Sequence, residues 1–215
     1  MSEYDYIVYT DGACIGNPGP GGWAVIIRDA KGNEQVLQGS ARRTTNNRME
    51  LRAALEALRT LPAEKHYRIL MRADSRLLVD ALTKGWAKRW RDHGWRRSSR
   101  ERVENVDLWA PLLEELEQRN VTVEWVKSHD TDLLNERCDK LAYAQALHPT
   151  EDDPGYRDTP RHEQTTTALP LDTSALHCHR IADDRIAISD GNATVVVPKQ
   201  SIPELLSRLA KLLIE

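Results

Sequence analysis

YIVYTDGACIGNPGPGG, residues 6–22, is the stretch of sequence that decides the fold. Its first five residues are all β-branched or aromatic, which predicts a strand over residues 6–10. The glycines and prolines of residues 16–22 then predict a turn. Strand-like stretches follow at 23–28 and 34–38, joined by the hairpin turn Lys31-Gly32-Asn33. The chain therefore begins with three strands in succession.

Helices and strands alternate after this hairpin region. Leucines and alanines at helical spacing predict a helix over 49–61, which the cap-forming residues 44–47 precede and Pro62 ends. The remaining pattern predicts, in order, a strand at 68–72, a helix at 76–83, a helix at 107–118, a strand at 121–126 and a helix at 135–147. This order is typical of an α/β domain, a mixed sheet flanked by helices.

Composition narrows the class of protein. The 215 residues are 40% hydrophobic and 29% charged, as in ordinary globular domains. Because no apolar run approaches the ~18–20 residues that cross a bilayer, we expect no membrane span and no membrane partner. The N-terminus lacks the pattern of a signal peptide. Three widely spaced cysteines fit a reduced protein better than a disulfide scaffold, so we expect a cytoplasmic location.

Residues 84–102 form a basic stretch. They contain eight Lys and Arg residues and two acidic ones, a net charge of +6, although the whole chain carries −3. Such a cluster indicates an anionic partner, most often phosphate. A solvated charged face is an equally common explanation of a charge run taken alone.

The C-terminal third differs in composition. Residues 148–176 are rich in Pro, Asp, Thr and Glu, which predicts a flexible linker. Residues 177–215 predict a small ββα unit, with strands at 185–189 and 193–197 and a leucine-striped helix at 201–214. Because so few residues cannot bury a core alone, this unit is expected to dimerise, to pack on the first domain or to fold on a partner.

Four carboxylates occupy positions that suit catalysis. Asp11 and Asp74 each follow a predicted strand, Glu50 lies in the first turn of the helix at 49–61, and Asp139 lies near the start of the last helix of the domain. If the two strands are parallel neighbours, both aspartates lie at the edge where α/β sheets bind ligands. Converging carboxylates suit a hard divalent cation such as Mg²⁺. Taken singly, each is more often a cap or a dipole partner, and spacing alone does not show that they converge.

In addition to these four carboxylates, several longer stretches of the sequence resemble the type 1 ribonuclease H family, between about Tyr4 and Tyr156. The matching stretches are Thr10–Cys14 with Gly16–Gly22, Thr44–Leu51, Ala73–Ser75, Asn105–Trp109, Glu124–Lys127 and Asn135–Asp139. The resemblance implies a five-stranded mixed sheet with helices on both faces and a catalytic domain over residues 1–147. It also implies cleavage of the RNA strand of RNA/DNA hybrids by two Mg²⁺ ions, with Mn²⁺ as a substitute, leaving 5′-phosphate and 3′-hydroxyl ends.

The resemblance also assigns roles to residues. Asp11, Glu50, Asp74 and Asp139 match the metal-binding carboxylates, and His129 matches a histidine that assists proton transfer or product release. The positions matched to substrate binding are Gly12, Cys14, Asn17, Thr45, Asn46, Arg76, Trp86, Arg89, Trp90 and Trp95. Arg76 and Arg89 depart from the family, which often has Gln and Asn there, and residues 128–134 replace its glycine-rich segment.

The sequence leaves two other functions to be weighed. A non-catalytic hybrid-binding protein of the same fold would need none of the four acids, so their presence disfavours it. A DNA-cutting relative would lack the Gly/Pro loop and the segment Thr44-Thr45-Asn46-Asn47, which match positions that sense 2′-hydroxyls. We therefore expect a hybrid-specific endoribonuclease.

Overall fold

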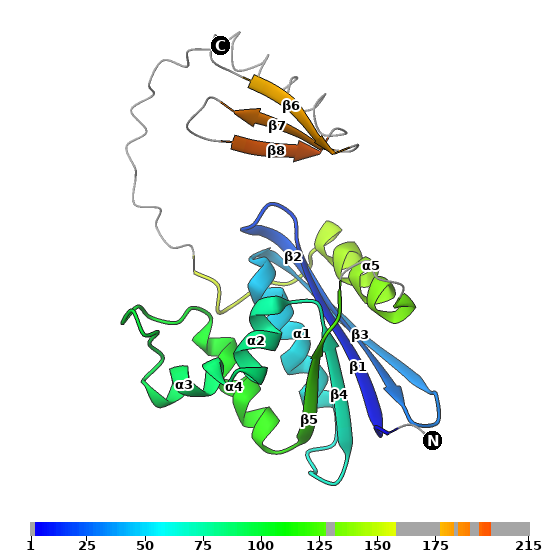
Figure 1. The fold of residues 1–215 in the computed structure, drawn as a ribbon. Coiled ribbons are helices and arrows are strands. Elements are labelled where there is room, and N and C mark those ends of the chain that lie inside the picture. The colour runs from blue at the N-terminus through cyan, green and yellow to red at the C-terminus, as the bar shows by residue number, and fades with distance from the viewer. Residues whose placement is uncertain (1–2, 128–131, 158–176, 183–184, 190–193, 199–215) are drawn as a thin grey trace. The chain divides into compact units, whose positions relative to one another are not determined.

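A computed structural model describes residues 3–127 and 132–157, together with 177–182, 185–189 and 194–198 of the C-terminal part (Figure 1). The first part contains β1 (Tyr6–Cys14), β2 (Gly19–Asp29), β3 (Glu34–Thr44), α1 (Asn46–Thr60), β4 (Arg68–Ala73), α2 (Arg76–Thr83), α3 (Trp86–Asp92), α4 (Val106–Glu117), β5 (Asn120–Trp125) and α5 (Leu133–Leu147). None of the helices in these described ranges is long and apolar enough to span a membrane.

The five strands form one mixed sheet in the order β3-β2-β1-β4-β5. β1 pairs antiparallel with β2 and parallel with β4, and β5 continues the sheet parallel to β4. The predicted five-stranded mixed sheet is therefore confirmed. β2 begins at Gly19, earlier than the expected position 23, because Gly21 and Gly22 pair with Cys14 and Ala13 of a lengthened β1.

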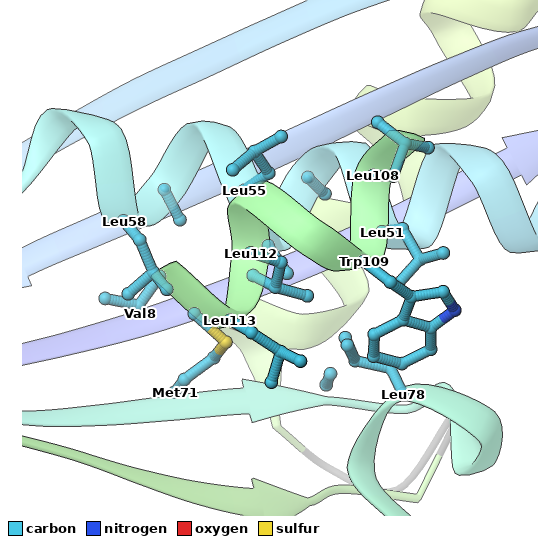
Figure 2. Close-up of a cluster of buried hydrophobic side chains, with 14 of the residues drawn as sticks. Val8, Leu51, Leu55, Leu58, Met71, Leu78, Leu108, Trp109, Leu112 and Leu113 are labelled. Carbon is cyan, nitrogen blue, oxygen red and sulfur yellow. The ribbon is translucent and has the colours of Figure 1, made fainter. Parts of the chain in front are cut away.

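Side chains alternate between the two faces of the sheet, and helices cover both (Figure 1). On one face, Val8, Met71, the leucines of α1 and α4 and the buried Trp109 form one hydrophobic cluster (Figure 2). On the other face, Tyr9 and its neighbours pack against Cys138 and Ala142 of α5. The two layers hold α1 and α5 against opposite faces of β1.

One helix was not predicted. α3 covers Trp86–Asp92, inside the basic stretch that the sequence showed only as a charge run. Its apolar positions are few, Trp86, Ala87 and Trp90, and Ala87 is completely buried. Basic residues separate these positions, so the sequence shows a charged stretch and no apolar repeat at helical spacing.

Interresidue contacts divide the chain into Met1–Arg157 and Asp158–Glu215. The first unit thus extends past Leu147, where we predicted its end, because residues 150–153 hydrogen-bond to β3 and α1. In the second unit, β6 (His177–Ala182), β7 (Arg185–Ser189) and β8 (Thr194–Pro198) form a three-stranded antiparallel sheet.

The hairpin predicted for the second unit is confirmed as β7 and β8, and β6 is a third strand that was not predicted. β6 was missed because the polar sequence HCHR gives little strand signal. The helix expected at 201–214 lies outside the described residues.

Candidate active site

Parallel pairing of β1 and β4 places two aspartates at one edge of the sheet. The register ends with Thr10 opposite Ala73, so Asp11 and Asp74 are the next residue of each chain segment. Asp11 was expected to end its strand, but β1 continues to Cys14 because β2 still pairs with it there. Asp11 is therefore held by strand pairing on one side, and only 5% of it is exposed.

Glu50 reaches the same edge because α1 lies directly on β1. A Cβ atom at Gly12 would collide with the backbone of Met49 and Glu50, so only glycine permits this approach. α1 begins at Asn46 with Thr45 as its N-cap, whose hydroxyl accepts a hydrogen bond from the Arg48 amide. Glu50 consequently lies one turn into the helix instead of in the expected first turn, and it is buried.

These three carboxylates form a compact cluster. One oxygen each from Asp11, Glu50 and Asp74 lies within 4.8 Å of the other two. They line a cavity of about 180 Å³ together with Gly12, Asn46, Asn135, Glu136 and Asp139. Asp139 lines the same cavity and its charge raises the pKa of Asp11, although it is not part of the three-residue cluster.

Burial and mutual repulsion make the charged state of the cluster costly. Burial, followed by the charges of Asp74 and Asp139, raises the pKa of Asp11 to about 8. Burial also raises the pKa of Glu50 well above its ordinary value, and the charge of Asp11 adds to the effect. Glu50 Oε2 is buried without a hydrogen-bond partner among the described residues. An all-oxygen donor set with an unsatisfied buried oxygen fits a hard divalent cation, which would stabilise the ionised carboxylates.

Asp132 anchors the helix that carries Asp139. Its Oδ1 accepts hydrogen bonds from the Leu134 and Asn135 amides at the start of α5. Its Oδ2 accepts a hydrogen bond from the Tyr9 hydroxyl at 2.9 Å, and Arg72 Nη1 donates to the same hydroxyl oxygen. α5 is thereby tied to β1 and β4, the strands that present the aspartates.

The positions matched to hydroxyl sensing lie around this cavity. Gly12 and Asn46 line it, and Asn17 joins the Gly/Pro loop to α1 because its Oδ1 accepts a hydrogen bond from the Asn46 amide. Cys14 is the last residue of β1, and its thiol lies within hydrogen-bond distance of the carbonyl oxygens of Gly19 and Thr44. The structure thus gives the Cys14 side chain contacts with the start of β2 and the end of β3.

Arg76 lies on the adjoining part of the edge. It begins α2, is exposed, and its guanidinium stacks 3.3 Å from the ring centroid of Trp125. The indole N–H of Trp125 donates to the Asp74 carbonyl. This stacking holds a positive charge close to the backbone of the cluster.

A second cavity, of about 560 Å³, contains most of the predicted aromatic and basic substrate contacts. It is lined by Leu77, Trp86, Arg89, Trp90, His93, Arg96, Arg97 and Ser98. Trp90 also packs edge-to-face on the buried Trp109, with ring centroids 5.7 Å apart. Trp95 is outside this lining and adopts a positive φ of 60°. The predicted His129 lies outside the described residues.

Three residues near the cluster were missed by sequence reasoning. Asn135 and Glu136 line the acidic cavity, and Arg48 lies buried two residues before Glu50. Asn135 was detectable, because it precedes Asp139 by four positions and so shares its helix face. The partners of Arg48 come from distant parts of the chain and leave no local pattern.

Comparison with known proteins agrees with the resemblance. The family model for RNase H matches residues 3–147. Ribonuclease HI of Synechocystis is 46% identical over 137 residues, covering 64% of this chain and 84% of that protein. Ribonuclease H of Escherichia coli O127:H6 is 43% identical over 150 residues, covering 70% of this chain and 94% of that protein.

A solved structure supports the same conclusion. LC9-RNase H1, a type 1 RNase H with the type 2 active-site motif, superposes with a TM-score of 0.60 at 32% identity. The match covers 70% of this chain and 75% of that chain. The family match spans well over half of the chain, so the predicted family is confirmed: the chain belongs to the ribonuclease H family of endoribonucleases.

Proposed function

We propose that this chain hydrolyses the RNA strand of RNA/DNA hybrids with two divalent cations, Mg²⁺ or its substitute Mn²⁺. The observation that carries the proposal is the cluster of Asp11, Glu50 and Asp74, whose oxygens lie within 4.8 Å of one another. Bound cations supply an activated water and neutralise the leaving oxygen of an in-line displacement. The expected products have 5′-phosphate and 3′-hydroxyl ends.

The carboxylates of the chain would hold the cations. The charges of both Asp74 and Asp139 raise the pKa of Asp11, so a cation at Asp11 would relieve repulsion from both neighbours. Asp11, Glu50 and Asp74 form the common site, and Asp139 extends it from α5. Without a cation, burial and mutual repulsion disfavour the ionised forms of Asp11 and Glu50. Because only ionised carboxylates bind the cations well, cleavage should require added metal.

The walls of the acidic cavity support selection of RNA as the cut strand. Gly12 and Asn46 place a backbone segment and an amide side chain beside the carboxylates. Such groups can donate to and accept from a 2′-hydroxyl, which DNA lacks. The Asn17 side chain accepts a hydrogen bond from the Asn46 backbone amide and so holds Asn46 in place beside the cavity.

The basic cavity supports binding of the second strand. Arg89, Arg96 and Arg97 surround Trp86 and Trp90 there. Arginines neutralise phosphates, and indole rings pack on sugars or bases without reading sequence. We assign this cavity to the DNA strand, with Thr45 and Arg76 as further contacts closer to the acids.

Location and domain organisation belong to the same proposal. Cys14 and Cys138 are free thiols, as is usual for cytoplasmic proteins. We therefore propose a cytoplasmic enzyme whose catalytic unit precedes a linker and a separate C-terminal unit.

The decisive assay compares matched RNA/DNA, RNA/RNA and DNA/DNA duplexes, each with Mg²⁺ or with a chelator. We expect internal cuts in the RNA strand of the hybrid only, and only with the metal. End-labelled products that resist a 5′-phosphate-dependent exonuclease would contradict the proposed ends. Cleavage of DNA/DNA, or of hybrid in chelator, would contradict the proposed function.

A further inference from the structure

Residues 148–157 lie beyond the part of the chain that matches the family model, yet they bind to the start of α1 and the end of β3. The Arg42 amide donates to the Glu151 carbonyl at 2.8 Å, and the Thr150 amide donates to Ser40 Oγ at 2.9 Å. This segment, called the strap below, therefore belongs to the catalytic unit.

The strap delivers Asp153 to a buried arginine. Arg48 Nε and Nη2 donate to the two carboxylate oxygens of Asp153 at 2.6 and 2.7 Å. Only 3% of the Arg48 side chain and 7% of the Asp153 side chain are exposed. A bidentate pair at this depth is screened little by water and fixes the orientation of both groups.

Asp107 at the start of α4 completes the grip on Arg48. It accepts from Nη1 at 2.9 Å and from Nη2 at 2.6 Å. Asn105, held at a positive φ of 58°, accepts from Nη1 as well. The guanidinium thus joins α1, α4 and the strap.

Two further contacts show how closely the strap fits. Thr44, the last residue of β3, donates from its hydroxyl to Asp153 Oδ2 at 2.7 Å. Gly155 passes so near Arg48 and Asp107 that a Cβ atom would collide with both side chains. Asp153 therefore contacts Thr44, which precedes the N-cap Thr45, and Arg48, which follows it in the first turn of α1.

Arg48 and Glu50 lie on different sides of α1. Two residues correspond to about 200° of rotation around a helix, so the two side chains point in roughly opposite directions. The rotation of α1 about its axis sets how far Glu50 extends toward Asp11. A fixed Arg48 on the other side of the helix sets that rotation.

We propose that Asp153 is a positioning residue of the active site, because by clamping Arg48 it holds the first turn of α1 and hence Asn46 and Glu50. The inference rests on the proposed function, since Asn46 and Glu50 matter there as substrate and metal contacts. It predicts that the strap affects metal and hybrid binding as well as stability.

The test uses the full chain with Asp153→Asn, and Asp152→Asn as matched control. Asp152 neighbours Asp153 and loses the same charge, but its side chain is 81% exposed, and its ion pair within the described part of the chain is with Arg42 on the surface. Calorimetry gives the dissociation constant for Mg²⁺, and initial rates give KM and kcat on the hybrid. We expect Asp153→Asn to raise the Mg²⁺ dissociation constant and KM at least fivefold, and Asp152→Asn to stay within twofold of the wild type.

A milder variant guards against misfolding. Thr44→Val removes one hydrogen bond to Asp153 and keeps the ion pair, so we expect a two- to threefold shift in the same direction. If the folded variants unfold at lower temperature while the Mg²⁺ dissociation constant and KM stay unchanged, the clamp only stabilises the fold and the inference is overturned. If the wild type cleaves no hybrid, the proposed function fails, and the Mg²⁺ titration still decides the role of Asp153.

Discussion

Asp11 and Asp74 each lie one residue past a paired position, Thr10 and Ala73, of two parallel strands. Their proximity follows from strand register, and α1 adds Glu50 because Gly12 lets the helix backbone approach β1. The positions of the three carboxylates therefore depend on strand pairing and on the packing of α1 against β1. Substitution of these carboxylates should change chemistry much more than structure.

Asp11→Asn should lower the rate of hybrid cleavage by more than ~10³-fold, since it removes the carboxylate that its neighbours share. Hybrid affinity, measured by fluorescence anisotropy, should change less than about threefold, because the basic cavity is untouched. Metal-dependent cleavage that survives in this variant would refute the metal-binding role of Asp11.

Metal-free protein should lose stability as the pH rises. The pKa of Asp11 is about 8 in the fold against 3.8 for an ordinary aspartate, so between these values the native state binds more protons than the unfolded state. The free energy of unfolding then falls by up to ~1.4 kcal/mol per pH unit over this interval.

Urea denaturation in chelator at pH 5 and pH 7.5 measures this slope. Adding Mg²⁺ should flatten it, since the cation favours the ionised carboxylates. Asp11→Asn should make the slope shallower without metal, and the raised pKa of Glu50 should leave part of it. A stability that rises with pH in chelator across this range would contradict the electrostatic description of the cluster.

The basic cavity should control the salt dependence of binding. Arg96→Ala and Arg97→Ala should each reduce the slope of log K against log salt by ~0.9 if each neutralises one phosphate. Arg59→Ala, at the far end of α1 and paired with Glu56, is the control and should leave the slope unchanged. Equal slopes for all three variants would exclude this cavity from phosphate binding.

A chain that ends after Arg157 should cleave the hybrid as the full chain does, whereas one that ends after Leu147 should be much less stable. The shorter chain lacks Asp153 and leaves Arg48 buried with fewer partners, at a cost of about 3–5 kcal/mol. Thermal unfolding and initial rates of both chains test the boundary. Loss of activity in the longer chain would show that residues 158–215 contribute to catalysis.

Local patterns predicted much of the fold. The leucines of α1, the cap-forming residues 44–47 and the stop at Pro62 predict a helix over 49–61, and α1 is observed over Asn46–Thr60, because period and capping are local properties. β2 was predicted too short, since its glycines read as a turn until the lengthened β1 pairs with them. Sequence patterns carry little information on pairing with a distant strand.

The acids of the site were predicted, but their environment was not. Their convergence needed either the family resemblance or the strand register, because spacing alone fixes no distance between β1, β4 and α1. The grip on Arg48 comes from Asp153, 105 residues away, in a segment whose composition predicted a linker. Composition gives only the average polarity of a segment, so it does not show that one of its aspartates, Asp153, has a buried partner.

The central claim is that Asp11, Glu50 and Asp74 share a divalent cation. Crystals soaked in Mn²⁺ and measured at the manganese absorption edge test it most directly. The claim predicts an anomalous peak about 2.0–2.6 Å from an oxygen of each of the three carboxylates, the range of metal–oxygen ligand distances from Mg²⁺ to Ca²⁺. If crystals at saturating Mn²⁺ show no anomalous peak between these side chains, or show peaks only elsewhere, the claim is contradicted.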